Sequence, residues 1–152
     1  MKNESGFKLV AAVMTTADAF LRESQRVFRP HGATGAQYNV LNLLAANSAG
    51  ISQRELGDLL VVDRSNVTGL LDRLEKLGWV RRDDHPDDRR VYRVSLTAAG
   101  LAKWKELHPL YLEAVARITR GLSKKQMSEA HAILLRLESS SGPAIPRQAR
   151  DE

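Results

Sequence analysis

The feature that most constrains the fold is a change of hydrophobic period at Gly78. Before this residue, apolar side chains recur at the spacing typical of amphipathic helices. From Trp79 to Leu96 they alternate with polar residues, which predicts two strands joined by an Asp-rich tip. The helical spacing returns after Thr97. The sequence therefore predicts a mainly helical α+β fold with one small β-hairpin.

Local signals place the limits of the helices before the hairpin. An apolar stripe runs from Phe7 to Phe28 and ends before a Pro- and Gly-containing segment. Two pairs have the form of a capping box, which marks the start of a helix: Thr34 with Gln37, and Ser52 with Glu55. The third helix, on the second pair, is expected to bury Leu56, Leu59 and Leu60 and to end near Val61 or Val62.

A fourth helix is predicted at residues 63–77, with Asp63 as its N-cap and Gly78 as a left-handed stop. Its polar residues lie on the side opposite an apolar stripe. We expect that stripe to be buried: Val67, Leu70, Leu71, Leu74 and Leu77.

Two helices are predicted after the hairpin. Thr97 caps the first, and Ser123 with Gln126 forms a capping box at the start of the last. Pro109 interrupts the first of them, so we expect a kink near residues 105–108 or a break into two helices. Residues 142–152 are typical of a frayed tail.

Composition limits the class of protein. The 152 residues are 43% hydrophobic, which is enough for one domain with a core. Cysteine is absent, which excludes disulfides and thiolate catalysis. No apolar run is long enough for a membrane span and no signal peptide is evident, so we expect a soluble cytoplasmic protein. A net charge of +5 allows a polyanionic partner without requiring one.

The order helix, helix, short turn, helix, two-stranded hairpin is that of a winged helix-turn-helix, which places its second helix in the DNA major groove. Residues 52–96 would form this unit. A polar outward face is also what any amphipathic surface helix shows. The side chains predicted to contact DNA from the helix at 63–77 are Arg64, Ser65, Asn66, Thr68 and Arg73.

Three segments resemble the MarR family of bacterial transcription regulators: "GATGAQYNVLNLLA", "SQRELGDLLVVDRSNVTGLLDRLEKLGWVRR" and "DDRRVYRVSLTAAG". The last contains the family's wing pattern D-x-R-x-x-x-V-x-L-T, and the likeness covers roughly residues 7–140. The resemblance implies a homodimer whose wing arginine enters the minor groove, steadied by an aspartate. This assigns Asp88, Arg89 and Arg90 to the DNA contact. Where many members have Asp before the wing proline, this chain has His85, which we expect to alter the hydrogen bonding of the tip.

The wing acids leave an alternative open. Asp83, Asp84, His85, Asp87 and Asp88 could hold a divalent metal, but arginines beside them compete for the same oxygens. We predict no metal and no other cofactor. An enzyme, such as a metal-assisted hydrolase, lacks support because no glycine-rich phosphate loop, nucleophile elbow or helical His-x-x-x-His pair is present. A winged helix that binds only protein remains the closer alternative.

The apolar stripes at both ends of the chain need a partner. A winged helix of about 45 residues cannot cover them, so we predict a two-fold homodimer and a pseudo-palindromic operator. Residues 1–32 and 98–141 would form the dimerisation region, residues 33–97 the DNA-binding region, and 142–152 a flexible tail. Folding back onto the same chain is the alternative. The predicted dimer contacts are Phe7, Val10, Met14, Val115, Ile118, Ile133, Leu134 and Leu137.

The resemblance also implies a small effector, commonly an aromatic or phenolic anion, between the dimerisation helices and the DNA-reading part. Binding of such a ligand would relieve repression by favouring one spacing of the two reading units. Tyr38, His31, Arg22 and Arg26 could supply stacking or a counter-charge. A plain core position for Tyr38 and solvated arginines are the alternative. His108 and His131 are expected on helix surfaces.

Overall fold

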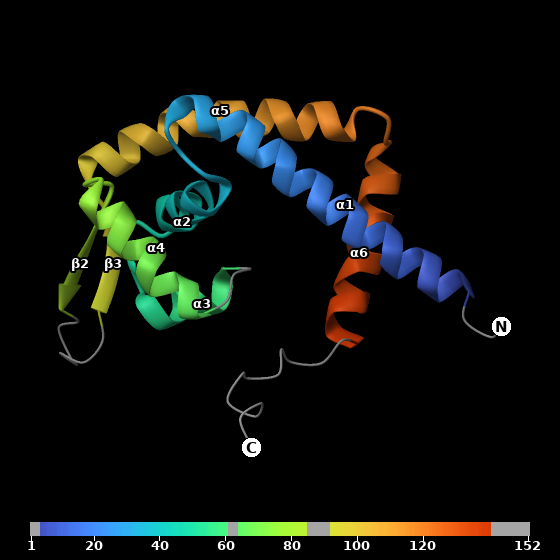
Figure 1. Ribbon diagram of the computed structural model, residues 1–152, viewed down its shortest axis with the longest axis horizontal. Coiled ribbons are helices and arrows are strands. Elements are labelled where there is room, and N and C mark those ends of the chain that lie inside the picture. The colour runs from blue at the N-terminus through green and yellow to red at the C-terminus, as the bar shows by residue number, and fades with distance from the viewer. Residues whose placement is uncertain (1–3, 61–63, 85–91, 141–152) are drawn as a thin grey trace, which may run out of the picture. The chain divides into compact units, whose positions relative to one another are not determined.

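The computed structural model describes residues 4–60, 64–84 and 92–140, without the side chains of Arg64, Ser65 and Asp84. Six α-helices, one 3-10 helix and three strands occupy these ranges (Figure 1). In chain order they are α1 Glu4–Phe28, η1 Arg29–His31, α2 Gly35–Ala46, β1 Ile51–Ser52, α3 Gln53–Leu59, α4 Arg64–Lys76, β2 Val80–Asp84, β3 Tyr92–Leu96, α5 Ala98–Thr119 and α6 Lys124–Ser140.

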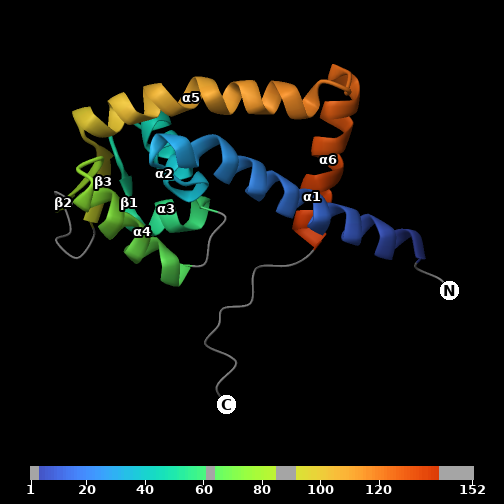
Figure 2. The ribbon, with the colours of Figure 1, turned by 45° about the horizontal axis from the view of Figure 1, so that its top comes forward.

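The chain divides into two units, residues 1–114 and residues 115–152. The first unit contains α1 to α4, the sheet and most of α5. Within it, α2 contacts α1, α4 and β3, and α3 contacts α4 and the sheet. Two views show α2, α3 and α4 gathered beside the strands (Figures 1 and 2). This bundle of α2, α3, α4 and the sheet is called the reading lobe below. The second unit contains the end of α5 and α6.

The sheet has three antiparallel strands in the order β1-β3-β2. Val94 in the middle of β3 pairs with Ile51 of β1 on one side and with Arg82 of β2 on the other. The hairpin prediction is confirmed, but β1 was missed. With only two residues, β1 shows no alternation, and its pairing with β3 joins segments far apart in the chain.

The core lies inside the first unit. One buried cluster contains Tyr38, Leu41 and Leu44 of α2 and Leu71 and Leu74 of α4. The cluster also contains Phe28, Leu56, Val80, Val94 and Leu107, so α1, α3, both hairpin strands and α5 each contribute to it. The predicted inner stripe of α4 is buried at Val67, Leu70, Leu71 and Leu74.

Three predicted helix starts are confirmed by their hydrogen bonds. Each capping box has both of its reciprocal bonds, at Thr34 with Gln37, Ser52 with Glu55 and Ser123 with Gln126. Thr97 accepts a hydrogen bond from the backbone of Gly100 at the start of α5. Gly78 adopts the predicted left-handed conformation, with φ of 70°. Asp63 lies outside the described residues.

The third helix is shorter than predicted. It ends at Leu59 rather than near Val61 or Val62, because Leu60 takes an extended conformation. The buried side of α3 contains Leu56, Gly57 and Leu60, and turns of about 100° per residue carry Leu59 past it. Leu59 is therefore 54% exposed, and its predicted burial is wrong.

Two other details differ from the sequence predictions. Leu77 follows the last residue of α4 and is 48% exposed, so the inner stripe ends at Leu74. Helix α5 continues through Pro109, and the predicted break into two helices is wrong. Leu107 and Ala114 are buried on either side of the proline. None of the helices in the described ranges has both the length and the apolar character of a membrane span.

Candidate DNA-binding surface

Helix α4 presents a polar side to solvent because its opposite side is anchored in the core. Leu71 and Leu74 have no exposed surface, whereas Asn66, Thr68 and Arg73 are exposed. At about 100° per residue, Thr68 lies on one flank of the helix, with Asn66 and Arg73 on the other. Three predicted DNA contacts therefore lie at the surface. The backbone of Arg64 and Ser65 opens the helix, but their side chains lie outside the description.

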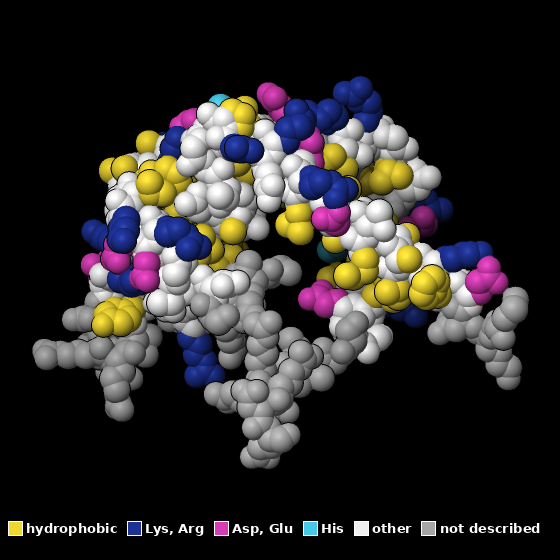
Figure 3. Space-filling view, in the orientation of Figure 1, with side chains coloured by type: hydrophobic (Ala, Val, Ile, Leu, Met, Phe, Trp, Pro, Cys, Tyr) yellow, Lys and Arg dark blue, Asp and Glu magenta, His cyan; other side chains and the backbone are white. Residues whose placement is uncertain are grey.

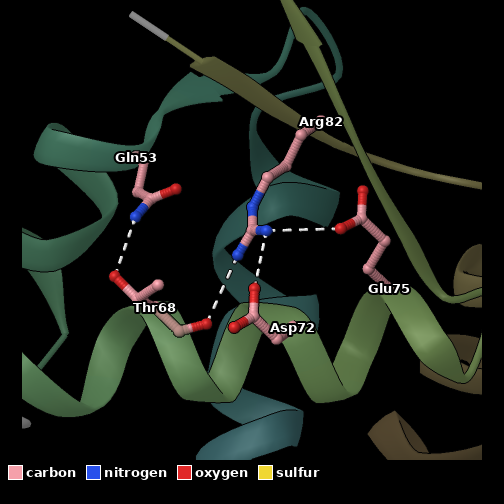
Figure 4. A network of polar contacts seen from close by, with 5 residues as sticks. All are labelled: Gln53, Thr68, Asp72, Glu75 and Arg82. Carbon is pink, nitrogen blue, oxygen red and sulfur yellow. Dashed lines mark hydrogen bonds and ion pairs between the residues drawn. The ribbon is translucent and has the colours of Figure 1, made fainter.

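A side-chain hydrogen bond connects the two helices of the helix-turn-helix. The Gln53 amide donates to the Thr68 hydroxyl over 3.2 Å (Figure 4). Gln53 is the first residue of α3, and Thr68 is one turn into α4. The bond leaves the hydroxyl proton of Thr68 free to donate. Gln53 was not predicted from the sequence, because the bond exists only once the two helices are packed.

A second connection runs from the hairpin to α4. Arg82 of β2 donates from Nη1 to Oδ1 of Asp72 over 2.7 Å and to Oε2 of Glu75 over 3.2 Å. Its Nη2 donates to the backbone carbonyl of Thr68 over 3.3 Å (Figure 4). Only 16% of the Arg82 side chain is exposed, and its Nε is buried without a partner among the described residues.

The outward side of the hairpin carries different contacts. Arg81 donates from Nε to the Ser95 hydroxyl over 3.0 Å and pairs with Asp83 at the same distance. The predicted tip residues Asp88, Arg89 and Arg90 lie outside the described residues, as do His85 and Asp87 of the alternative metal site. Within the described part of the chain, no three acidic or histidine side chains come together as a metal site would require.

Charges on the visible face of the reading lobe are mixed. Lysine and arginine side chains alternate with acidic ones over α4 and the hairpin (Figure 3). Between residues 63 and 93 the sequence has eight basic and seven acidic side chains, a balance of 8 − 7 = +1. Any attraction for a polyanion therefore depends on the placement of individual side chains more than on bulk charge.

The residues predicted to form a dimer contact are all accessible. On α1, Phe7, Val10 and Met14 are 76%, 57% and 68% exposed. Hydrophobic side chains gather over the N-terminal part of this helix (Figure 3). Leu137, a predicted contact in the second unit, is half-buried. The other predicted contacts in that unit are 37% to 49% exposed: Val115, Ile118, Ile133 and Leu134.

The four residues predicted to bind an effector fall into two groups. Arg22 and Arg26 lie on the surface of α1 and pair with Asp18 and Glu23 of the same helix. The hydrogen bond to Glu23 raises the pKa of the Arg26 guanidinium. His31 and Tyr38 instead contact α5. Nδ1 of His31 lies 3.1 Å from the carboxylate of Glu106, and the Tyr38 hydroxyl lies 2.9 Å from Nδ1 of His108.

Tyr38 is a core residue whose hydroxyl contacts His108 and, at 3.5 Å, the side-chain oxygen of Asn42. It is 1% exposed, and its ring stacks on that of Phe28 at 4.6 Å between centroids. Burial, with a smaller contribution from Tyr111, raises the pKa of Tyr38 to about 12. With this pKa, the Tyr38 hydroxyl stays protonated at neutral pH. The Tyr38 ring also lies 4.9 Å from the Tyr111 ring, measured between centroids.

An aromatic and polar cluster between α2 and α5 was missed by sequence reasoning. His108, predicted on the helix surface, is half-buried and stacks on Trp104 at 4.7 Å between ring centroids. The Trp104 indole donates to the Asn42 side chain over 3.1 Å. The signal was present as two pairs at a spacing of four, Tyr38 with Asn42 and Trp104 with His108, which put each pair on one helix face.

A second missed contact joins η1 to α5. Lys103 donates to the carboxylate of Glu106 over 2.7 Å and to the backbone carbonyl of His31 over 3.2 Å. Hydrogen bonds from Lys103 and then His31 lower the pKa of Glu106. The Lys103 ammonium also lies 5.5 Å from the centroid of the Trp79 ring.

Comparison with known proteins decides the family. The family model for the MarR family matches residues 31–91. Multiple antibiotic resistance protein MarR of Escherichia coli is 31% identical over 128 residues, which cover 84% of this chain and 86% of MarR. The chain belongs to the MarR family.

Two further similar proteins agree with this assignment. HTH-type transcriptional regulator PecS of Dickeya dadantii is 29% identical over 119 residues, covering 77% of this chain and 72% of PecS. A crystal structure of a mutant MarR from E. coli complexed with operator DNA has a TM-score of 0.73. It is 28% identical and covers 90% of this chain and 95% of that one. The protein is thus a winged-helix transcription regulator, and its family comprises DNA-binding regulators rather than enzymes.

Proposed function

We propose that this MarR-family protein is a homodimeric repressor that binds a pseudo-palindromic operator and is released by a small ligand. It would act in the cytoplasm, where chromosomal DNA lies. The observation that carries the proposal is the exposure of Asn66, Thr68 and Arg73 on a helix whose leucines are fixed in the core. A dimer that covers both half-sites hinders access of RNA polymerase, which favours repression.

Contacts to bases and to phosphates are divided between α4 and the wing. Asn66, Thr68 and Arg73, with Arg64 and Ser65, suit base edges and nearby phosphates in the major groove. Asp88, Arg89 and Arg90 form the wing contact, in which an arginine enters the narrow minor groove and the aspartate restricts its rotamers. The net charge of residues 63–93 is only +1, which supports DNA binding that depends on the placement of individual side chains.

A second copy of the chain would cover the apolar faces of α1, the end of α5 and α6. Their exposed aromatic and aliphatic side chains are of the kind found in the buried centre of an interface. Two-fold symmetry would then place two α4 helices on one side of a duplex. Half-sites about one helical turn apart, roughly 34–36 Å, would match them.

The effector would be a small aromatic or phenolic anion. The ring cluster between α2 and α5 supports this class, because Tyr111 is 39% exposed beside buried Tyr38 and Phe28. Arg22 and Arg26 would supply the counter-charge. Each would leave its ion pair with a carboxylate of α1 and pair with the anionic ligand instead. His31 would complete the site together with the buried Tyr38, which would act through its contact with the partly exposed Tyr111. A ligand that prefers one arrangement of the dimer alters DNA affinity without touching DNA.

Selection of bound fragments from random duplexes tests the proposal. We expect one enriched motif with two inverted half-sites, bound with an affinity that falls steeply between low and moderate salt. Repeating the selection with phenolic acids should reduce recovery of that motif. Failure to bind any duplex at low salt would overturn the proposed function and favour a protein-binding winged helix.

Two variants test the division of contacts. Arg90→Ala should weaken binding to all duplexes and reduce the salt slope by about one. Asn66→Ala should cost about 1–3 kcal/mol on the selected motif and change the preferred bases. Arg29→Ala is the control, since it removes an exposed charge on η1, away from α4. Equal losses on every sequence for both variants would contradict this assignment.

A further inference from the structure

Arg82 occupies a strand position where the sheet pattern calls for an apolar residue. Residues that face each other across an antiparallel pair share one side of the sheet, and Arg82 is opposite Val94, which has no exposed surface. Val80, two residues earlier on the same side, is 2% exposed. Arg81, between them, is on the outward side and is 65% exposed. The arginine therefore points inward, beneath α4.

The acceptors of Arg82 form one stripe along α4. Thr68, Asp72 and Glu75 are four and three residues apart, so they lie on the same flank of the helix over two turns. Figure 4 shows the guanidinium between these three groups. A planar guanidinium with several fixed donors can contact them together, which a lysine ammonium cannot do in the same geometry.

An apolar side chain would suit packing at this position better than arginine. The guanidinium leaves Nε buried without a partner among the described residues, and an unpaired buried donor is unfavourable. Asp72 and Glu75 are about half exposed, so the ion pairs are partly screened by water. What arginine adds is a directional connection between the hairpin and α4. A role in function explains the residue better than a role in packing.

Thr68 is held from two sides. Its carbonyl accepts from Arg82, and its hydroxyl accepts from Gln53 of α3. A helix rotates as a rigid body, so any rotation that moves the Thr68 flank outward moves Asn66 and Arg73 on the other flank inward. The Arg82 contacts therefore oppose the motion that would misalign all three predicted base contacts together.

We propose that Arg82 is a positioning residue for DNA reading, which couples the wing hairpin to α4 and fixes the rotation of that helix. It acts through Thr68, Asp72 and Glu75 and does not touch DNA. The same contacts neutralise part of the negative charge that Asp72 and Glu75 would otherwise present beside the phosphates. The inference rests on the proposed function, since it requires that α4 reads an operator.

The test measures the discrimination ratio, defined as the affinity for the selected operator divided by that for a scrambled duplex. We expect Arg82→Met to lower this ratio at least about tenfold, the discrimination of one good base contact. Arg81→Gln is the matched control. It removes the same charge from the adjacent residue on the outward side, and its ratio should stay within about twofold of wild type.

A triple variant separates positioning from charge. Arg82→Met with Asp72→Asn and Glu75→Gln removes the contacts but leaves no unneutralised carboxylate. Affinity for the scrambled duplex should return to the wild-type value or above it, while the ratio stays low. Recovery of the ratio would show that Arg82 acts only through charge and would overturn the proposal.

Arg82→Lys is a second, more conservative variant, which keeps the test possible if Arg82→Met does not fold. It retains the charge, and the ratio should fall between those of wild type and Arg82→Met. Thermal unfolding of every variant identifies a temperature at which all are folded, and binding is compared there. An unchanged ratio for folded Arg82→Met and Arg82→Lys, or an equal loss on both duplexes with a lower salt slope, would overturn positioning. If the wild-type protein binds no duplex, the proposed function itself fails, which is a distinguishable result.

Discussion

The reading lobe and the helices at the two ends of the chain have similar apolar patterns but different burial. In the lobe, Tyr38, Leu41, Leu56 and Leu71 are all at most 1% exposed. In α1 only Phe28 is buried, and none of residues 115–140 is. An amphipathic stripe predicts a helix with a buried face but does not say which chain buries it. The core of the lobe is buried within one chain, with Phe28 of α1 and Leu107 of α5 completing it, whereas the apolar faces of the end helices are exposed in the single chain.

The largest expected effect comes from placing charge on the face of α6 that we assign to the dimer. Ile133→Glu with Leu134→Glu should raise the dimer dissociation constant at least about a thousandfold, about 4 kcal/mol, because unpaired carboxylates would be buried. Sedimentation equilibrium should then give the monomer mass of 16.9 kDa. Ser128→Glu, on the opposite side of α6, is the control. A monomeric wild-type protein would refute the predicted dimer.

The next effect concerns the core of the lobe. Leu71→Ala should lower the free energy of unfolding by about 2–5 kcal/mol, because Leu71 has no exposed surface and the alanine leaves a cavity. Leu112→Ala is the control, since Leu112 is 52% exposed, and it should cost under about 1 kcal/mol. Denaturant unfolding measures both. Similar losses for the two variants would show that exposure does not distinguish these positions.

A smaller effect is expected at the contact between α2 and α5. Tyr38→Phe keeps the stacked ring but removes the hydroxyl 2.9 Å from His108, so unfolding should become easier by about 1 kcal/mol. Tyr111→Phe, which alters a partly exposed residue of the same ring cluster, should have less effect. A Tyr38→Phe protein as stable as wild type would mean that this hydrogen bond makes no net contribution.

The smallest effect depends on pH. Hydrogen bonds from Lys103 and His31 lower the pKa of Glu106 in the folded protein. A carboxylate with a depressed folded pKa stabilises the fold above its unfolded pKa, and this contribution disappears as the pH falls through the folded pKa. Glu106→Gln should therefore lower Tm slightly at neutral pH and not in acid. A loss of Tm that grows towards acid pH would contradict the predicted pH dependence. Glu113→Gln on the same helix serves as a control.

Local features of the fold could be predicted from the sequence because their causes are local. Three capping boxes and the glycine stop after α4 each depend on residues within one helical turn. Strand β1 and the contact between His108 and Tyr38 could not be predicted in this way. Each depends on segments that meet only after the chain has folded, such as β1 with β3 and α2 with α5.

The candidate DNA-binding surface also combines features with local causes and features that depend on the folded chain. The exposed side of α4 follows from the spacing of its leucines, so Asn66, Thr68 and Arg73 could be named from the sequence. The contacts that hold this helix, from Gln53 and Arg82, were not foreseen. Charge alone does not reveal them, because Arg81 and Arg82 are adjacent and identical yet face opposite sides of the sheet.

The number of chains bound to one selected duplex shows whether two copies of this protein read the operator together. Sedimentation equilibrium of the protein with duplexes that carry one or two half-sites gives this number. We predict two chains on a duplex with two inverted half-sites about one turn apart, and much weaker binding to a single half-site. One chain per duplex, with equal affinity for one and two half-sites, would contradict the view that the end helices join two reading lobes.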